Sequence, residues 1–267
     1  MPQNRPLGFW AGAIMLALAV VILAVGPILY DVSPTEQDLF ATLQPPSAAH
    51  PLGADQYGRD VLARVLHGGR VSFLAALAIV TVSLAVGCVA GWLAAHQSLL
   101  GALLSHGIDT LLSLPGLIVA LAVVGALGVG LGNLLIAFVL VGWPWYARIV
   151  RGLVIERRTM PDILAARAFG VGDIAIFRGH ILPHTLRTLA IIAALDLGYV
   201  IAGLSGFSYL GLGAQPPAAE WGAMLDDAQT YFVVAPWLLL GPAAGIVVTV
   251  LATTLIAEQV HGRGIAR

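Results

Sequence analysis

Ionisable side chains are scarce in this sequence, and two of its carboxylates lie inside apolar stretches. Only 10% of the 267 residues are charged, whereas 59% are hydrophobic. Asp109 follows the run LLSHGI, and Asp196 lies within ALDLGYVIAGLSGFSYLG. An ionised group is costly inside a membrane and usually faces a cavity or a partner. We therefore interpret Asp109 as a structural residue near a membrane surface and Asp196 as a candidate residue of a polar pathway.

The residues that follow Asp196 suggest a polar, narrow helix. Tyr199 stands three positions later, so it shares a helical face with the carboxylate. Ser205 and Ser208 continue the polar character of the same stretch. These four residues are our candidates for a translocation path, and a carboxylate there would favour a cationic substrate. Helix packing is the competing explanation for the glycines that stand between these four residues, and for the Gly87 to Gly91 spacing.

Catalytic and metal-binding motifs are absent from the sequence. All 13 basic residues are arginine, so the lysine that a P-loop needs to reach phosphates is missing. No Gly-x-Ser-x-Gly or His-Glu-x-x-His motif occurs. His180 and His184 stand four residues apart without a third ligand, and Cys88 is a lone cysteine in an apolar run. The sequence therefore predicts no enzyme, no catalytic residue, no metal site and no bound cofactor.

The hydrophobic stretches predict the helices that contain these residues. The mean hydropathy of +0.92 lies outside the range of ordinary soluble domains. A helix needs about 20 apolar residues to cross a bilayer. The sequence predicts an all-α membrane protein of about six spans, with five as the alternative because only glycines separate the third from the fourth. The spans are expected near residues 9–29, 71–95, 110–130, 132–147, 188–213 and 233–256.

The arginines predict the orientation of the spans. With six spans and an inside N-terminus, only Arg59, Arg64 and Arg70 fall on the outer side, and the other ten arginines face the cytoplasm. Cytoplasmic loops carry an excess of basic residues. Both termini are therefore predicted to be cytoplasmic, and no basic cluster points to a nucleic-acid partner. The largest cytoplasmic loop is then residues 148–187.

That loop contains the stretch AARAFGVGDIAIFRGHILPH, from Ala165 to His184. Small residues at its start predict a short helix with a thin face that can lie close to another surface. Gly172 and Asp173 then provide a break and a cap, and Pro183 can begin the next helix. The alternative is a solvated connector whose arginines only fix topology.

The stretch resembles the coupling-loop signature of a known family, the inner-membrane permease subunits of ATP-binding cassette importers for dipeptides, oligopeptides and nickel. The usual signature has Glu-Ala-Ala, three residues and Gly, followed by Ile-x-Leu-Pro. Leu164 stands where the family has Glu, and His184 where it has Asn. The small-residue surface is retained, but the polar contact that a Glu would make with the ATPase is not expected. The resemblance assigns ATPase coupling to Ala165, Ala166, Ala168, Gly170, Ile181 and Pro183.

Two further segments extend the resemblance over most of the chain. HPLGADQYGRDVLARVLHGGRVS, from His50 to Ser72, resembles the region before the second span of the family's smaller permease. FSYLGLGAQPPAAEWGAML, from Phe207 to Leu225, resembles the outer loop between the last two spans. As plain structure, the first segment would be an interfacial helix with Val61, Leu62, Val65 and Leu66 on its apolar face. The second would be a surface turn at Pro216 and Pro217.

The resemblance implies a division of labour among several chains. Residues 1–70 would form a signal-anchor helix, an external loop and an interfacial helix, and residues 71–267 the permease domain of a bacterial inner-membrane protein. A second homologous permease, two ATPase subunits and an extracytoplasmic solute-binding protein are the implied partners. ATP and Mg²⁺ would be bound by the ATPases, because this chain has no site for them.

The substrate is the most open part of this interpretation. The segments after Asp196 and the run WPWYARIVRG are closer to the nickel and metal-chelate permeases, so nickel or a metal chelate is the expected cargo. Dipeptide or oligopeptide import is the alternative, since no set of His, Cys and carboxylate ligands for Ni²⁺ is present. A membrane scaffold that passes no substrate is an alternative of another class. A secondary transporter is a third, but it would require inverted repeats that we do not find.

Overall fold

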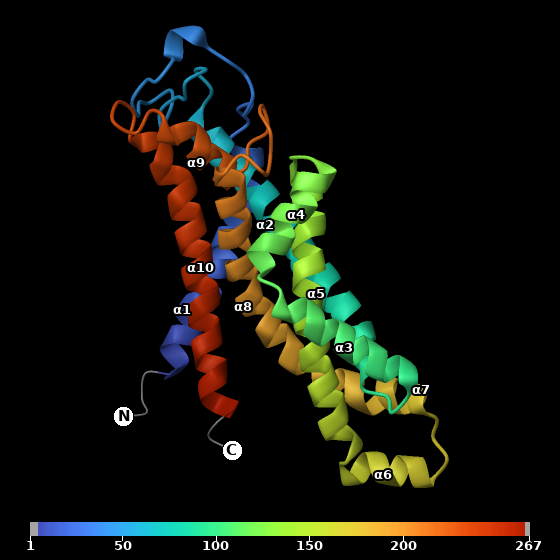
Figure 1. Cartoon of the computed structure of the whole chain (residues 1–267). Helices are drawn as coiled ribbons and strands as arrows, with labels where there is room; N and C mark the ends of the chain where they lie inside the picture. Colours follow the sequence, from blue (N-terminus) through green and yellow to red (C-terminus); the bar gives the residue numbers. More distant parts are fainter. Residues whose placement is uncertain (1–4, 265–267) are drawn as a thin grey trace. The chain divides into compact units, whose positions relative to one another are not determined.

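The computed structural model describes residues 5–264, with side-chain surroundings for residues 8–257. Helices form nearly all of the regular structure (Figure 1), and the described range contains no β-strand beyond an isolated bridge between Ala54 and Asp60. The expected all-α class is confirmed. The chain forms two compact units: the first comprises Met1–Ala78, Val124–Leu135 and Ala194–Arg267, and the second Ile79–Val123 and Ile136–Ala193. The division expected at residue 70 stays a prediction.

Five helices in the described range are long and apolar enough to cross a membrane, and one bent helix pair could form a sixth span. Three of the five spans are the single helices α1 (Arg5–Leu29), α2 (Val61–Ala94) and α5 (Leu131–Arg158). The fourth span, Asp173–Tyr209, ends with α8 (Leu182–Tyr209), and the fifth, Trp237–Ala257, lies within α10 (Trp237–Gly264). The bent pair is α3 (Leu99–Ser113) with α4 (Gly116–Leu127), whose axes differ by 92°.

The third predicted span, residues 110–130, is wrong as a single straight helix. Leu114 is extended, with φ −82° and ψ 137°, and Pro115 follows it. A proline disfavours helical backbone at the preceding residue and has no N–H to donate. The glycine break that we predicted after this span is present between α4 and α5. Gly128 and Gly130 have φ of +92° and +143°, which side-chain-bearing residues rarely adopt.

Two other boundaries differ from the prediction. The segment expected as a separate interfacial helix, with Val61 and Leu62 on its apolar face, is continuous with the second span because α2 begins at Val61. The fourth span does not end at residue 147, since α5 continues to Arg158. The predicted loop 148–187 is therefore mostly helical. It contains the end of α5, α6 (Pro161–Ala168), α7 (Asp173–Ile176), a π-helical turn (Phe177–Ile181) and the start of α8.

In the first unit, glycines allow close contacts around α10. Figure 1 shows α1 beside α10, and a Cβ at Gly12 would lie 2.7 Å from the Ala252 carbonyl oxygen. The Trp221 ring of α9 (Trp221–Gln229) fits between Gly69 of α2 and Gly245 of α10. The indole Nε1 donates to the Val65 carbonyl at 3.0 Å. α9 is thereby fixed against two spans.

In the second unit, α2 and α5 pack closely through the Gly87 to Gly91 pair. A Cβ at Gly87 would collide with Tyr146, and one at Gly91 would lie 2.8 Å from the Val150 Cβ. Small residues of this kind allow membrane helices to approach each other. The packing role predicted for these two glycines is therefore what the structure shows.

The π-helical turn before α8 explains how the chain accommodates Pro183. The Leu182 N–H bonds to the Phe177 carbonyl, five residues back. A proline ring clashes with the carbonyl four residues before it in a regular α-helix, and local widening relieves such a clash. Pro183 therefore does not start the helix as predicted, but lies in its first turn after an unbroken helical lead-in.

Candidate coupling surface and polar face

The short helix predicted in the charged loop is present as α6, at the far end of α5 in Figure 1. Met160 is extended before it, and Pro161 takes the first helical position, where a missing N–H costs nothing. Asp162 lies in the first turn and Arg167 in the last, and both charges suit the helix dipole. Ile163 is fully buried and anchors the helix to its unit.

Large apolar side chains are exposed in this region. Leu164, Phe169 and Ile174 are large hydrophobic residues with exposed fractions of 52%, 88% and 63%. We call these three residues the coupling surface. Ala165 and Ala168 are exposed near them, and Ala166 is half-buried. Exposed apolar groups of this size beside polar side chains are typical of protein interaction sites.

Gly170 forms the turn that follows α6. Its φ is +79°, and no atom would meet an added Cβ within 4 Å. The glycine is therefore needed for its backbone conformation and not for a close contact. Arg167 contacts Asp173 at 3.3 Å across this turn, and Arg157 contacts Asp162 at 2.7 Å at the start of α6.

The chain after the turn is anchored by buried aromatic and aliphatic side chains. Phe177 stacks on Trp92 of α2, with ring centroids 4.8 Å apart. Ile176 and Ile181 are buried at 1% and 2% exposure. Ile181 is thus an anchor, while Pro183 is exposed. The structure splits the six predicted coupling residues into an exposed group on α6 and its turn, and a separate pair at the start of α8.

The four predicted path residues do not share one face of α8. Tyr199 is 79% exposed and Asp196 is half-buried, with its own interactions. Ser205 and Ser208 are buried, and their hydroxyls have no hydrogen-bond partner among the described residues. Both serines pack close to Gly222 of α9. The structure therefore separates half-buried Asp196 and exposed Tyr199 from a buried packing pair.

The sequence interpretation missed a buried polar contact that holds α9 in place. Glu220 is fully buried, and its Oε1 accepts a hydrogen bond from the Ser72 hydroxyl at 2.7 Å. Its Oε2 caps α9 by accepting from the Ala223 N–H. The Trp221 N–H donates to the same Ser72 oxygen. A Glu that precedes a Trp at a helix start was a local signal for the cap, but its partner on α2 was not predictable.

A second feature that we missed is an ion cluster in the first unit, formed by Asp55, Arg59, Arg64 and Asp227. Arg59 is buried, and its Nε donates to Asp55 Oδ2 at 2.6 Å. Arg64 is also buried and contacts Asp55 at 3.4 Å and Asp227 at 3.6 Å. Burial raises the pKa of the Asp227 carboxyl, although the two guanidinium groups oppose that shift. We call these four residues the outer ion cluster.

Asp60 joins three other segments beside this cluster. Its Oδ2 accepts from the Tyr30 hydroxyl and contacts His50 Nδ1, each at 2.9 Å. Its Oδ1 accepts from the Ala63 N–H at the start of α2. Burial, and then the hydrogen bond to Asp60, raise the pKa of Tyr30 to about 12. The segment that begins at His50 is therefore held by buried polar contacts and is not only a surface helix.

The remaining candidates have simpler surroundings. Asp109 pairs with Arg148 at 2.8 Å, and both side chains are about half exposed. His180 and His184 are exposed. The described residues contain no group of three or more His, Cys, Asp or Glu side chains that could hold a metal ion. Arg267, one of the arginines used for the orientation, lies outside the described residues.

Comparisons with known proteins fit this architecture. Residues 70–263 match the family described as binding-protein-dependent transport system inner membrane component. The chain is 34% identical to the nickel transport system permease protein NikC of Escherichia coli strain K12, over 93% of this chain and 90% of that protein. It is 36% identical to the dipeptide transport system permease protein DppC of Alkalihalophilus pseudofirmus, over 92% and 82%.

A solved structure shares the fold at lower identity. A chain of the MetNI methionine ABC transporter, in an inward-facing conformation, matches with a TM-score of 0.54 and 18% identity. The match covers 75% of this chain and 94% of that chain. At this identity the likeness shows the fold alone.

Proposed function

Because the chain belongs to the family of inner membrane components of binding-protein-dependent transport systems, as a multi-pass membrane protein, we propose that it is the permease subunit of an ATP-driven importer. It forms the translocation path with a second, homologous permease chain. Two separate ATPase subunits and an external solute-binding protein complete the assembly. The observation that carries this proposal is the coupling surface, a set of exposed apolar side chains on α6 and in the segment that follows it.

Coupling would use the anchors behind that surface. When ATP binding closes the two ATPases, a docked α6 is displaced with them. Buried Ile163 ties α6 to its unit, and the Trp92–Phe177 stack ties the following turn to α2. A packed element of this kind moves as a body rather than deforming. The displacement is thereby passed to α2 and α8, which shift between inward and outward states.

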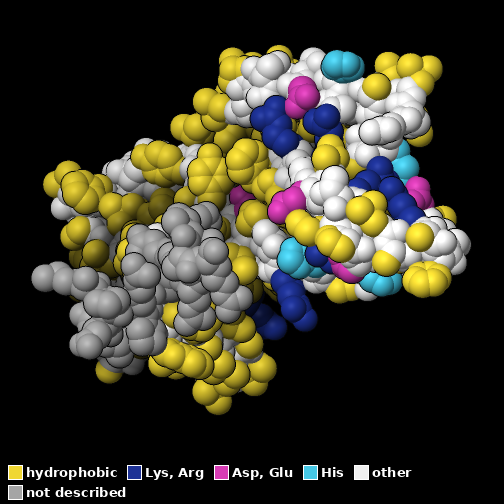
Figure 2. Space-filling view, turned by 90° about the horizontal axis from the view of Figure 1, so that it is seen from below, with side chains coloured by type: hydrophobic (Ala, Val, Ile, Leu, Met, Phe, Trp, Pro, Cys, Tyr) yellow, Lys and Arg dark blue, Asp and Glu magenta, His cyan; other side chains and the backbone are white. Residues whose placement is uncertain are grey.

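The proposed orientation places both termini and α6 in the cytoplasm. The second unit holds seven arginines and four carboxylates, an excess of three positive charges. Figure 2, seen from below, shows arginine, carboxylate and histidine side chains gathered on one part of this face, with hydrophobic side chains between them. An arginine-rich end of a membrane protein favours the cytoplasmic side. The outer ion cluster then lies on the side of the solute-binding protein.

The part of α8 with half-buried Asp196 and exposed Tyr199 would face the second permease across the path. Nickel or a metal chelate remains our proposed cargo, and a carboxylate on the path suits a cation. Dipeptide import is the second candidate, because one relative is named for nickel and another for dipeptides.

Asp196→Asn should slow transport more than it lowers the amount of folded protein. Equal losses of transport and of folded protein would show that Asp196 has a structural role.

The test is uptake of radiolabelled nickel by cells that express this chain with its co-transcribed partners. Uptake that requires ATP and resists excess dipeptide would support a metal or metal-chelate importer. Accumulation of labelled dipeptide without nickel would move the chain to peptide import. No ATP-dependent uptake of either, with the partner proteins assembled, would favour the scaffold alternative.

A further inference from the structure

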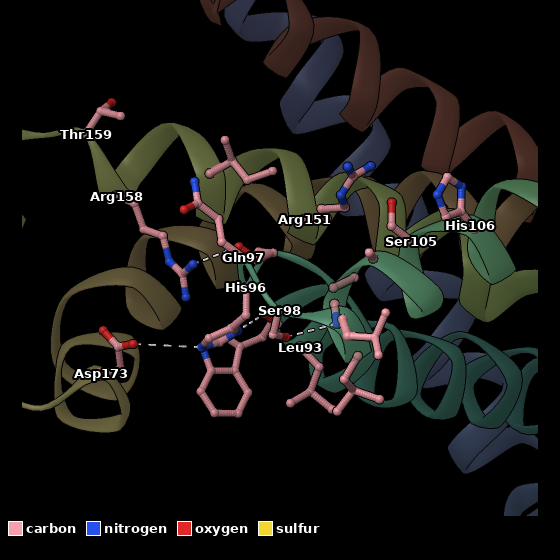
Figure 3. Close-up of a pocket in the computed structure, with 18 of the residues that line it drawn as sticks. Leu93, His96, Gln97, Ser98, Ser105, His106, Arg151, Arg158, Thr159 and Asp173 are labelled. Carbon is pink, nitrogen blue, oxygen red and sulfur yellow. Dashed lines mark hydrogen bonds and ion pairs between the residues drawn. The ribbon is translucent and has the colours of Figure 1, made fainter.

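A large open cavity lies in the second unit, behind the coupling surface. Its volume is about 1330 Å³. It is lined by the end of α2, the turn to α3, the first turn of α3 and the last turns of α5, with Arg167 and Asp173 at one side. Figure 3 shows side chains from α3 and α5 around this space, with His96 directed toward Asp173. The proposed transport mechanism makes no use of this cavity.

Two arginines of α5 give the cavity an excess of positive charge, although Asp173 also lines it. Arg151 and Arg158 stand seven residues apart, so they lie on one face of the helix. Neither has a carboxylate within 4.0 Å among the described residues, whereas Arg167 pairs with Asp173 and Arg148, outside the cavity, pairs with Asp109. Arg158 donates instead to the Ala95 carbonyl at 2.7 Å. The Nε of Arg151 is buried with no hydrogen-bond partner.

The start of α3 adds to the positive potential. Ser98 caps this 15-residue helix by accepting from the Gly101 N–H, and the residues of its first turn line the cavity. The free N–H groups of a helix start carry about half a positive charge. Arg151 lies near Ser105 and His106 in Figure 3, and all three line the cavity. The site is therefore built for an anion that accepts several hydrogen bonds.

The position of these arginines along α5 corresponds to the depth of lipid headgroups. At about 1.5 Å per residue, Arg151 lies about 30 Å from Leu131 and Arg158 about 40 Å. The hydrocarbon core is about 30 Å thick, and the headgroup layers extend the bilayer to about 40–45 Å. If α5 begins at one face of the core, both guanidinium groups lie in the headgroup layer of the other face.

An apolar rim lies next to the charged wall. Leu99, Leu100 and Leu103 of α3 are all more than half exposed, and the first two line the cavity. Exposed leucines are unfavourable around a site for a soluble anion, because they would remain in water. Beside acyl chains they would be covered, as on helices that lie in a membrane interface.

We infer that this cavity binds the phosphate group of an anionic phospholipid, with Arg151 and Arg158 as its cationic partners. Inorganic phosphate offers the same oxygen atoms, but not the chains that would cover the leucine rim. Both guanidinium groups attract an anionic headgroup electrostatically. Removing both should weaken lipid binding at least about tenfold.

The test is native mass spectrometry of the full chain, purified in detergent and titrated with phosphatidylglycerol or phosphatidylcholine. The double variant Arg151→Gln with Arg158→Gln should lose affinity for phosphatidylglycerol by the stated factor. Arg148→Gln with Arg187→Gln is the matched control, because it removes two arginines of the same unit outside the cavity. Its affinity should stay within about twofold of the parent, because Arg148 is already paired with Asp109 and the exposed charge of Arg187 is screened by salt.

A charge-conserving variant separates folding from binding. Arg151→Lys with Arg158→Lys should retain most of the affinity, while the Gln variant should elute as the same monodisperse species. Equal affinity of the Gln variant and its control for phosphatidylglycerol would overturn the inference. Stoichiometric binding of inorganic phosphate without retention of phosphatidylglycerol would also overturn the lipid assignment. Equal retention of phosphatidylcholine would show that negative charge is not what is recognised.

Discussion

The outer ion cluster and the coupling surface use charge in opposite ways. In the outer ion cluster, Arg59 and Arg64 are buried and share Asp55 and Asp227. Around the coupling surface, the carboxylates Asp162 and Asp173 are about half exposed, and each contacts one arginine. The first arrangement fixes distant segments to each other. The second leaves a short helix supported mainly by Ile163 and free to present apolar side chains.

The difference follows from the cost of burying charge. A buried ion needs partners that replace water, and the loss of one partner leaves the others uncompensated. An exposed ion keeps most of its hydration, so its partner contributes little. We therefore expect substitutions in the outer ion cluster to change stability, and substitutions at the coupling surface to change assembly and transport.

The largest effect is expected from Arg59→Ala. It removes the central cation of the outer ion cluster and leaves Asp55, which is buried, without its closest partner. Breaking a buried ion pair costs about 3–5 kcal/mol. The measurement is the free energy of unfolding of the purified chain in mixed detergent and SDS. Arg70→Ala is the control, because Arg70 lies in the same unit but is exposed. Equal losses for the two variants would remove the distinction between buried and exposed charge.

The next effect is expected from Phe169→Asp at the coupling surface. Phe169 is 88% exposed, so the change should leave folding intact. A charge in the middle of an apolar docking face should weaken ATPase binding about tenfold or more, because it must be desolvated there. Co-purification of the ATPase subunits with the permease measures this. Val233→Asp is the control: Val233 is equally exposed, but it lies in the other unit. Undiminished co-purification of the Phe169 variant would place the docking site elsewhere.

The sequence predicted local features of both regions but not their partners. The helix α6 and its turn follow from a proline, small residues and Gly170, all close together in the chain. The outer ion cluster joins Arg59 to Asp227, which lies 168 residues later, and no local pattern contains that pairing. The arginines of this segment were therefore used only to predict which side of the membrane they face.

One wrong span boundary, and one candidate set that combined two faces of a helix, had signals that we did not use. Pro115 marked the break between α3 and α4, but the hydrophobicity around it suggested one continuous span. Ser205 follows Asp196 by nine residues, which is about two and a half helical turns. That spacing places the two side chains on opposite faces of α8. Helical geometry alone should have separated them, whereas the packing of Ser205 against Gly222 required the structure.

A smaller loss of stability is expected at high pH, when the Tyr30 phenol ionises. Its pKa is raised to about 12 from 10.0, so the folded state holds the phenol proton more tightly than the unfolded state. The stabilisation from this proton is complete below pH 10 and is lost as the pH rises toward 12. Unfolding measured across this window should show the loss in the parent chain. Tyr30→Phe should lack that component, and identical pH profiles would contradict the assignment of the hydrogen bond to Asp60.

The smallest effect is expected from Asp162→Asn beside the coupling surface. The variant removes an ion pair with Arg157 that is short, at 2.7 Å, but has a half-exposed carboxylate. Exposed pairs contribute about 0.2–1 kcal/mol, and the favourable charge at the start of α6 adds a similar amount. The same SDS unfolding experiment should therefore show a loss well below that of Arg59→Ala. A loss as large as the Arg59 effect would mean that charge pairs, and not Ile163, hold α6, and that the two regions are stabilised alike.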